Sequence, residues 1–187
     1  GIRYINNNEK FDNIILMDGD GEDRPEEIKS LLKQIQNDPN VSVVAKRVKR
    51  SEGPFFQFLY KMHKMLTFIF TGKRINFGNY SCLIKSDVEK ISSKPSLWSS
   101  FSGTVKKNIT KLNEINSTRG SRYFGPSKMS LFKLLIHSFS IIAVFKFQVF
   151  LRSIFFIFIL IFTSQIYEDI SFFFLSLILI FNLIIFV

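Results

Sequence analysis

The stretch that decides the fold reads Ile14-Ile15-Leu16-Met17-Asp18-Gly19-Asp20-Gly21-Glu22-Asp23-Arg24-Pro25-Glu26. Its four leading apolar residues have the length and composition of a buried β-strand. Acidic residues that follow such a strand directly lie at its carboxyl end, the edge where open α/β sheets bind ligands. Asp18 and Asp20 are two residues apart, so in an extended chain their side chains point to the same side, and Glu22 continues the pattern.

This acidic pattern predicts a metal site formed by Asp18, Asp20 and Glu22. Carboxylate oxygens suit Mg²⁺ or Mn²⁺, and such an ion is typically held by one or two carboxylates together with substrate phosphates. A purely structural acidic turn is the simpler alternative. An EF-hand loop is excluded because it needs Gly at its sixth position and Glu at its twelfth, where this chain has Asp23 and Lys29.

The acidic stretch lies inside a predicted β-α-β unit. A helix follows it from Pro25 to Gln36, with Asp23 placed to cap its first turn, and a second strand covers Val41–Ala45. Because a crossover of this length joins parallel strands, the sequence predicts an α/β fold with a covered sheet. The later pattern predicts a helix over Phe55–Phe70, a strand over Ile75–Ser81, a helix opened by a capping box at Ser86, and a strand over Ile109–Ile115. Gly78 in the first of these strands allows close approach to the backbone.

Two groups of cations indicate phosphate binding. Lys46-Arg47-Val48-Lys49-Arg50 follows the second strand, on the same sheet edge as the acids, and Arg47 is the candidate for ligand contact. A solvated loop or a membrane-surface patch is the alternative for Lys49 and Arg50. Residues 119–129 contain three cations and two glycines without apolar periodicity, which predicts a flexible phosphate clamp that includes Arg119 and Arg122.

Charge and apolarity are segregated along the 187 residues. All 25 Lys and Arg and 13 of the 15 acids lie in the first 152 residues, whereas Val149–Tyr167 carries only Arg152 and Ile170–Val187 carries no charge. Helices of 18 or 19 residues reach about 27–29 Å, close to the roughly 30 Å of a bilayer core. The sequence therefore predicts two membrane spans joined at Glu168-Asp169, and the Lys and Arg on the near side place the basic part in the cytoplasm.

The remaining features fit a membrane-bound protein. Leu131–Phe147 is predicted to be an amphipathic helix in the membrane interface, and His137 on it, like His63, is interpreted as structural or interfacial. Cys82 stands alone, which excludes an internal disulfide and fits a small buried residue. A nucleic-acid partner is disfavoured, because anionic lipid headgroups already account for the basic surface. Three parts are predicted: a domain over 1–128, the interface helix over 129–148, and the transmembrane hairpin over 149–187.

In this order, the motifs resemble the membrane-associated family 2 glycosyltransferases of the dolichol-phosphate mannosyltransferase and bactoprenol glucosyltransferase group. That group carries Asp-Ala-Asp-Leu-Gln-Asp-Pro-Pro-Glu after a strand, which is similar to the stretch over 18–26 with Glu22 in place of Gln. Its Gly-x-Arg is similar to Lys46-Arg47, and its Thr-Gly and Gly-x-Phe are similar to Thr71-Gly72 and 78–80. Its loop Arg-x-x-Arg-x-x-Gly-x-Ser-Lys is similar to the positions Arg119, Arg122, Gly125, Ser127 and Lys128.

The resemblance implies a partial, Rossmann-like GT-A domain, here without the amino-terminal part that binds the nucleotide base, so the chain is expected to be a fragment. It implies that Asp18 and Asp20 hold the cation on the diphosphate of a nucleotide sugar. Asp20 and Arg47 would serve the transfer directly, and Arg47 would contact phosphate. Donor or acceptor phosphates would be bound by Arg119, Arg122, Ser127 and Lys128.

The implied reaction is inverting transfer of a sugar from a nucleotide-diphosphate sugar to polyprenyl phosphate. Two other functions stay open at this point. In one, an enzyme of the same fold glycosylates a glycan or a protein, and its hydroxyl acceptor requires a base. In the other, the protein is a catalytically silent membrane scaffold that binds anionic lipid or a protein partner.

Overall fold

The computed structural model describes residues 1–49, 54–125, 130–164 and 168–186. Its elements in the order of the chain are α1 (Ile2–Asn8), β1 (Asn13–Leu16), the 3₁₀ turn η1 (Pro25–Glu27), α2 (Ile28–Asn37), β2 (Val43–Lys49), α3 (Pro54–Thr71), β3 (Phe77–Ile84), α4 (Lys85–Ser92), the 3₁₀ turn η2 (Pro95–Leu97), α5 (Phe101–Asn108), β4 (Asn113–Thr118), α6 (Leu131–Ala143), α7 (Lys146–Thr163) and α8 (Glu168–Phe186).

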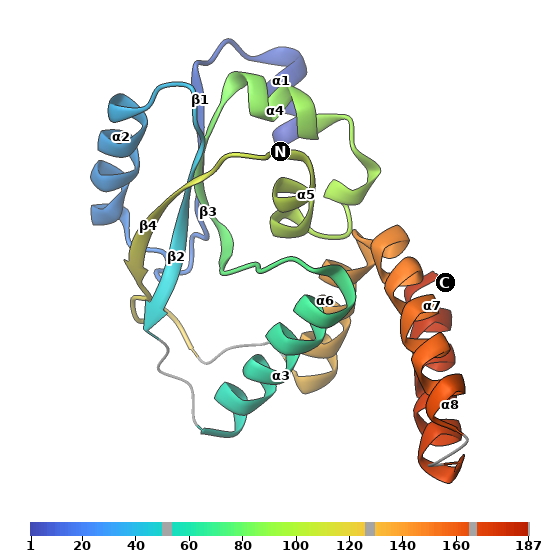
Figure 1. Cartoon of the computed structure of the whole chain (residues 1–187). Helices are drawn as coiled ribbons and strands as arrows, with labels where there is room; N and C mark the ends of the chain where they lie inside the picture. The colour runs from blue at the N-terminus through green and yellow to red at the C-terminus, as the bar shows by residue number, and fades with distance from the viewer. Residues whose placement is uncertain (50–53, 126–129, 165–167, 187) are drawn as a thin grey trace.

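The four strands form one mixed sheet in the order β1-β3-β2-β4 (Figure 1). Both β1 and β2 pair antiparallel with β3, and β2 pairs parallel with β4. Strands β1 and β2 therefore run in the same direction, as the β-α-β prediction requires, but β3 lies between them. Cys82 of β3 stands opposite Ile15 on one side and Val43 on the other, and it is fully buried, as predicted. Burial raises the pKa of the Cys82 thiol to about 11, so the group stays uncharged.

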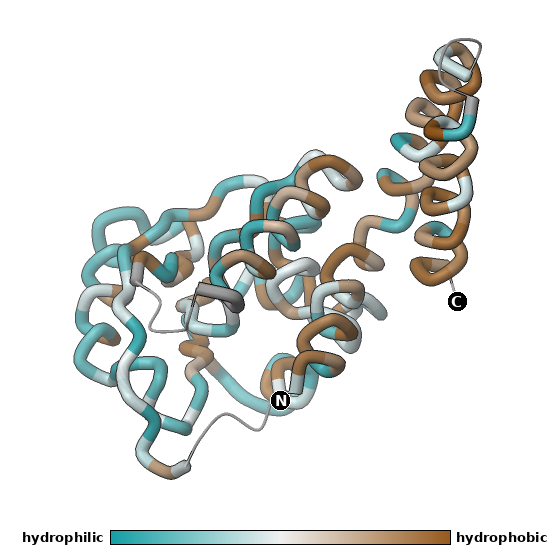
Figure 2. Tube along the Cα trace, turned by 90° about the horizontal axis from the view of Figure 1, so that it is seen from below, coloured by the Kyte–Doolittle hydropathy of each residue, from teal (hydrophilic) through white to brown (hydrophobic). Residues whose placement is uncertain are grey.

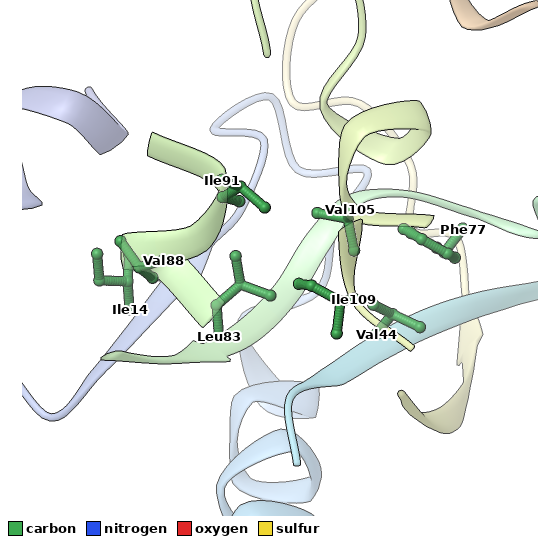
Figure 3. Packing of buried hydrophobic residues seen from close by; sticks show 8 residues of the cluster. All are labelled: Ile14, Val44, Phe77, Leu83, Val88, Ile91, Val105 and Ile109. Carbon is green, nitrogen blue, oxygen red and sulfur yellow. The ribbon is translucent and has the colours of Figure 1, made fainter. Parts of the chain in front are cut away.

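Helices cover both faces of the sheet, because successive side chains of a strand point to opposite sides. Val43 and Ala45 pack with Leu31 and Ile35 of α2, whereas Val44 faces the side covered by α4 and α5 (Figure 1). The core on this second side is drawn in Figure 3, where the labelled side chains come from three strands, from α4 and α5, and from the residue directly after α5: Ile14, Val44, Phe77, Leu83, Val88, Ile91, Val105 and Ile109.

The α/β prediction is confirmed, with corrections to several elements. Strand β2 continues to Lys49, so Lys46 and Arg47 lie within the strand and not in a loop after it. The last strand is β4, and Ile109, which was assigned to it, is a buried core residue at the end of α5. Leu32 of α2 is 40% exposed, although the helical period places it beside the buried face.

The capping box predicted at Ser86 is wrong. Helix α4 begins at Lys85, and the residue at its cap, Ile84, makes no side-chain hydrogen bond to the first turn. Ile84 is still paired with Asn13 of β1, so the strand runs into the helix without a loop in which Ser86 could cap. Asp87 in that first turn is buried and accepts a hydrogen bond of 2.6 Å from Ser42 Oγ.

The carboxyl-terminal helices form a separate apolar layer. Its buried centre contains one residue from each of four helices: Phe70 of α3, Ile142 of α6, Val149 of α7 and Ile185 of α8. Helices α7 and α8 pack against each other and extend away from the sheet as a mostly apolar pair (Figure 2). Both are long and apolar enough to cross a membrane, over Lys146–Thr163 and Asp169–Phe186.

The helices α6 and α7 begin and end differently from the prediction. Helix α6 ends at Ala143 and α7 begins at Lys146, so the predicted interface helix is shorter and the first apolar span starts earlier. Only Val149 and Ser153 of α7 are buried, which differs from the core helix of a soluble protein. Arg152, the one charge predicted inside this span, donates a hydrogen bond of 2.9 Å from Nη1 to the carbonyl oxygen of Ile69 in α3.

Candidate functional site

The acidic turn after β1 is folded upon itself by its own carboxylates. The N–H of Asp18 donates to Oδ2 of Asp23 at 3.0 Å, and the N–H of Glu22 donates to Oδ1 of Asp20 at 3.1 Å. The neighbouring strand β3 supplies Asn79, whose Nδ2 donates to Oδ1 of Asp18 at 3.1 Å. Asp18 is therefore held by a residue 61 positions away in the sequence, at the edge of the sheet that the sequence predicted.

Arg47 joins this turn from strand β2. Its Nη2 lies 3.7 Å from Oδ1 of Asp23, and its guanidinium lies over Gly78 of β3. A Cβ atom at Gly78 would lie 3.0 Å from Nη2 of Arg47. The close approach predicted for this glycine is therefore confirmed: the guanidinium of Arg47 lies against the backbone of β3. The two sequence motifs that were expected to meet at this edge are thus connected through Asp23.

Asp23 is the residue whose role the sequence did not reveal. It was predicted to cap the following helix, but the first turn at Pro25 has Arg24 at its cap and no side-chain cap bond. Its carboxyl group is only 4% exposed. Burial raises the pKa of Asp23, against the hydrogen bond from the Asp18 N–H and the charge of Arg47, which both lower it. An Asp just before Arg-Pro is typical of a helix cap, so no local signal pointed to the contact with Arg47.

The loop after β4 lies against the acidic turn. Arg122 donates to both carboxylate oxygens of Glu22, from Nε at 2.9 Å and from Nη2 at 3.3 Å, and Nη2 of Arg119 also binds Oε2 of Glu22. Nη2 of Arg122 lies 3.3 Å from Oδ2 of Asp20 as well. These bonds, with the charges of Glu22, Asp20 and Asp18, raise the pKa of the Arg122 guanidinium above its usual value.

Main-chain bonds reinforce the same contact. The N–H of Gly120 donates to the carbonyl oxygen of Glu22, and the N–H of Tyr123 donates to that of Asp20, both at 2.9 Å. A Cβ atom at Gly120 would lie 2.5 Å from the carbonyl oxygen of Gly21, so the two chain segments pass very close to each other. The described part of the predicted flexible clamp has no regular secondary structure, as expected. These hydrogen bonds nevertheless hold it against the acidic turn.

A divalent cation can be tested against these contacts. Both oxygens of Glu22 are engaged by arginines, so Glu22 does not fit a metal-ligand role in this arrangement. Asp20 is engaged less tightly, by the Glu22 N–H at 3.1 Å and by Arg122 at 3.3 Å. Asp18 and Asp20 remain the candidates, because a Mg²⁺ or Mn²⁺ ion needs only one or two protein carboxylates when substrate phosphates complete its shell. Among the described residues, no group of three or more His, Cys, Asp or Glu side chains is arranged to hold a metal ion. The metal site stays a prediction that rests on the two aspartates.

We expect Gly21→Ala to loosen the acidic turn, whereas Gly19→Ala should be neutral. Gly21 has a φ of +90°, and a Cβ atom there would lie 2.9 Å from the ring of Tyr123. At Gly19, nothing lies within 4 Å of such an atom. Left-handed strain of this kind costs about 1–3 kcal/mol, so chemical denaturation followed by circular dichroism should show a lower free energy of unfolding for Gly21→Ala alone. Equal values for the two variants would contradict the fit of Tyr123 on Gly21.

The positive charge of Arg47 acts on His137 of α6, which the sequence did not indicate. The side chain of His137 is exposed, but partial desolvation and the charge of Arg47 lower its pKa. Since the folded protein takes up this proton less readily than the unfolded chain, the contribution of His137 to stability is lost as the pH falls through the unfolded pKa, near 6.5.

We therefore expect His137→Gln to flatten the loss of stability between about pH 7 and pH 5. Denaturation curves at several pH values measure this slope. His63→Gln makes the same change at the other histidine and serves as the control. If His137→Gln leaves the slope unchanged, His137 does not feel Arg47 as described.

The structure places most of the predicted site residues together. Arg122 contacts both Asp20 and Glu22, and Arg119 contacts Glu22. Asp18 lies in the same turn, bonded to Asp23 and Asn79, and Arg47 joins the turn through Asp23. Ser127 and Lys128 lie outside the described residues. Lys46 of the basic run pairs with Glu114 of β4 at 3.5 Å. The sequence did not indicate the contacts of Asp23, Asn79 and Tyr123, and only Asn79, next to Gly78, carried a usable signal.

Comparison with known proteins bears on the part of the chain that contains the acidic turn, Arg47 and Asn79. The family model described as glycosyl transferase family 2 matches residues 1–101. Arg119 and Arg122 lie beyond the matched segment. No curated protein matches the chain.

Proposed function

The chain belongs to glycosyl transferase family 2, and from that premise we propose that it moves a sugar from a nucleotide-diphosphate sugar to polyprenyl phosphate at a membrane. The observation that carries the proposal is the meeting of the acidic turn, Arg47 and the arginine loop at one edge of the sheet. A donor diphosphate needs cations around it and a carboxylate-bound metal beside it, and these groups would supply both kinds of contact.

The chemistry follows from the charge of the acceptor. A lipid phosphate is anionic at neutral pH, so its oxygen can attack the anomeric carbon without a protein base. The new bond between this oxygen and the carbon forms as the bond to the donor diphosphate breaks, and the nucleoside diphosphate leaves with the electron pair. A divalent cation bound by Asp18 and Asp20 would neutralise the diphosphate. Arg47 would stabilise the charge that develops on the leaving group, the electrostatic contribution that usually dominates catalysis.

The other cations have positioning roles in this proposal. Arg119 and Arg122 would hold donor or acceptor phosphates, and Ser127 and Lys128 would extend the same loop. The two apolar helices α7 and α8, with the adjoining α6, support a membrane location for this reaction. The Lys and Arg confined to the first 152 residues support a catalytic part on the cytoplasmic side.

Transfer to a hydroxyl group of a glycan or a protein is the second candidate. The observation that favours it is His137, whose pKa is lowered by desolvation and by the charge of Arg47. A neutral imidazole can accept the proton that a hydroxyl acceptor must lose.

The test is a transfer assay with the protein expressed from its complete reading frame. UDP- and GDP-sugars are supplied with Mn²⁺ and polyprenyl phosphate, and the products are separated into lipid and water-soluble fractions. We expect a lipid-linked sugar with polyprenyl phosphate and none with the matched polyprenyl alcohol, which lacks the anionic nucleophile. Sugar transferred to a glycan or a protein in the absence of lipid phosphate would favour the second candidate.

A further inference from the structure

We propose that Glu22 is the resting partner of Arg119 and Arg122, and that phosphate groups of the incoming ligand replace its carboxylate on these two arginines. The inference rests on the proposed function for the identity of the incoming ligand, the diphosphate of a nucleotide sugar. It changes the role of Glu22 from a metal ligand to a positioning residue that keeps the phosphate-binding arginines in place before the substrate arrives.

The geometry of the contact supports this role. Arg122 donates two hydrogen bonds to Glu22, one to each carboxylate oxygen, at 2.9 and 3.3 Å. Arg119 donates to one of the same oxygens. Two guanidinium groups around one carboxylate form the arrangement that also binds phosphate, because the planar fork of Arg matches both anions. A side chain of this protein therefore fills the position that a phosphate would take.

The surroundings permit an exchange. The side chains of Arg119, Arg122 and Glu22 are 21%, 27% and 14% exposed, so an anion from solution can reach the arginines. The main-chain bonds from Gly120 and Tyr123 to the acidic turn do not involve the Glu22 side chain. The loop can thus remain in place while the carboxylate is replaced, and the arginines stay oriented for the phosphates.

Pyrophosphate is the probe, because it carries the diphosphate without nucleotide or sugar. Its affinity is measured by isothermal titration calorimetry on the protein from the complete reading frame, in EDTA and again with Mn²⁺. In EDTA, we expect Glu22→Gln to bind pyrophosphate about tenfold more tightly than the wild type, since a competing charge-assisted hydrogen bond is removed. Glu26→Gln is the matched control, because Glu26 is 72% exposed and pairs only with Arg24, at 3.7 Å, among the described residues.

The sign of the effect separates the two roles of Glu22. If Glu22 were a metal ligand, Glu22→Gln would bind pyrophosphate more weakly than the wild type in Mn²⁺ and equally well in EDTA. That pattern would overturn the proposal. The double variant Glu22→Gln/Arg122→Gln should lose the gain in pyrophosphate affinity. A gain that persists in the double variant would also count against the proposal. Glu22→Asp keeps the charge but shortens the reach, so it provides a second variant with an expected gain of a few fold.

The outcomes for this inference and for the proposed function are distinguishable. Pyrophosphate binding requires no sugar transfer, so a tighter Glu22→Gln variant in a protein that fails the transfer assay would support the exchange and refute the proposed acceptor. A protein that transfers sugar to polyprenyl phosphate but shows no gain in pyrophosphate affinity for either variant would keep the proposed function and refute the exchange.

Discussion

Asp20→Asn is expected to lower the rate of sugar transfer by about 10²–10³-fold, the loss typical of removing one electrostatic group from an active site. The asparagine keeps the shape of the side chain and can still accept the hydrogen bond from the Glu22 N–H, which Asp20 accepts at 3.1 Å. It lacks the negative charge that a divalent cation requires, so the fold of the turn should survive while the cation is bound more weakly. Initial transfer rates and Mn²⁺ titration measure the two effects.

Asp12→Asn provides the matched control for this prediction. Asp12 is exposed and precedes β1, whereas the acidic turn follows the other end of the same strand. We expect this variant to keep both its transfer rate and its Mn²⁺ affinity. Full activity of Asp20→Asn would show that the metal assignment is wrong.

Arg47→Gln is expected to lower both the transfer rate and the stability of the protein. The transfer rate should fall by about 10²-fold, since Arg47 is proposed to stabilise the leaving diphosphate. The free energy of unfolding should fall by about 1–3 kcal/mol, because Asp23 is left as a buried carboxylate without its ion pair. Transfer assays and chemical denaturation report the two effects separately.

The double variant Asp23→Asn/Arg47→Gln separates the two roles of Arg47. The amide oxygen introduced at position 23 can still accept the hydrogen bond from the Asp18 N–H, and no buried charge remains. We therefore expect stability to return to within about 1 kcal/mol of the wild type, as for a neutral hydrogen-bonded pair. Transfer should remain low. Recovery of transfer in the double variant would mean that Arg47 acts only as the partner of Asp23.

The sequence was most informative where local patterns decide the structure. The apolar run before Asp18, the helical period of α2 and the β-branched residues of β2 each reflect the side chains of a single element. Each of these elements formed, although β2 begins at Val43 and continues to Lys49. The order of the strands does not follow from such patterns. Strand β3 lies between β1 and β2, where Leu83 completes the core on one face of the sheet and Cys82 completes the core on the other. This arrangement depends on contacts between residues far apart in the chain.

The same distinction holds for the site. The spacing of Asp18 and Asp20 indicated a ligand-binding edge, and the cations in β2 and after β4 indicated which segments face it. The partner of each charge could not be inferred, since Glu22 and Arg122 are 100 residues apart. Asp23 shows the limit most clearly, because its local context favours a helix cap, whereas the position of Arg47 in the folded protein gives it a different partner.

The bond from Arg152 to Ile69 connects the first apolar helix to the last turn of α3. Helix α3 stands between β2 and β3 in the chain, the strands that carry Arg47 and Asn79. If α7 and α8 cross a bilayer as proposed, a mismatch between their length and the thickness of the hydrocarbon layer is relieved by tilting. Through the bond from Arg152, such a tilt would act on the end of α3. Transfer rates measured in bilayers of different acyl-chain length would show whether this connection reaches the acidic turn.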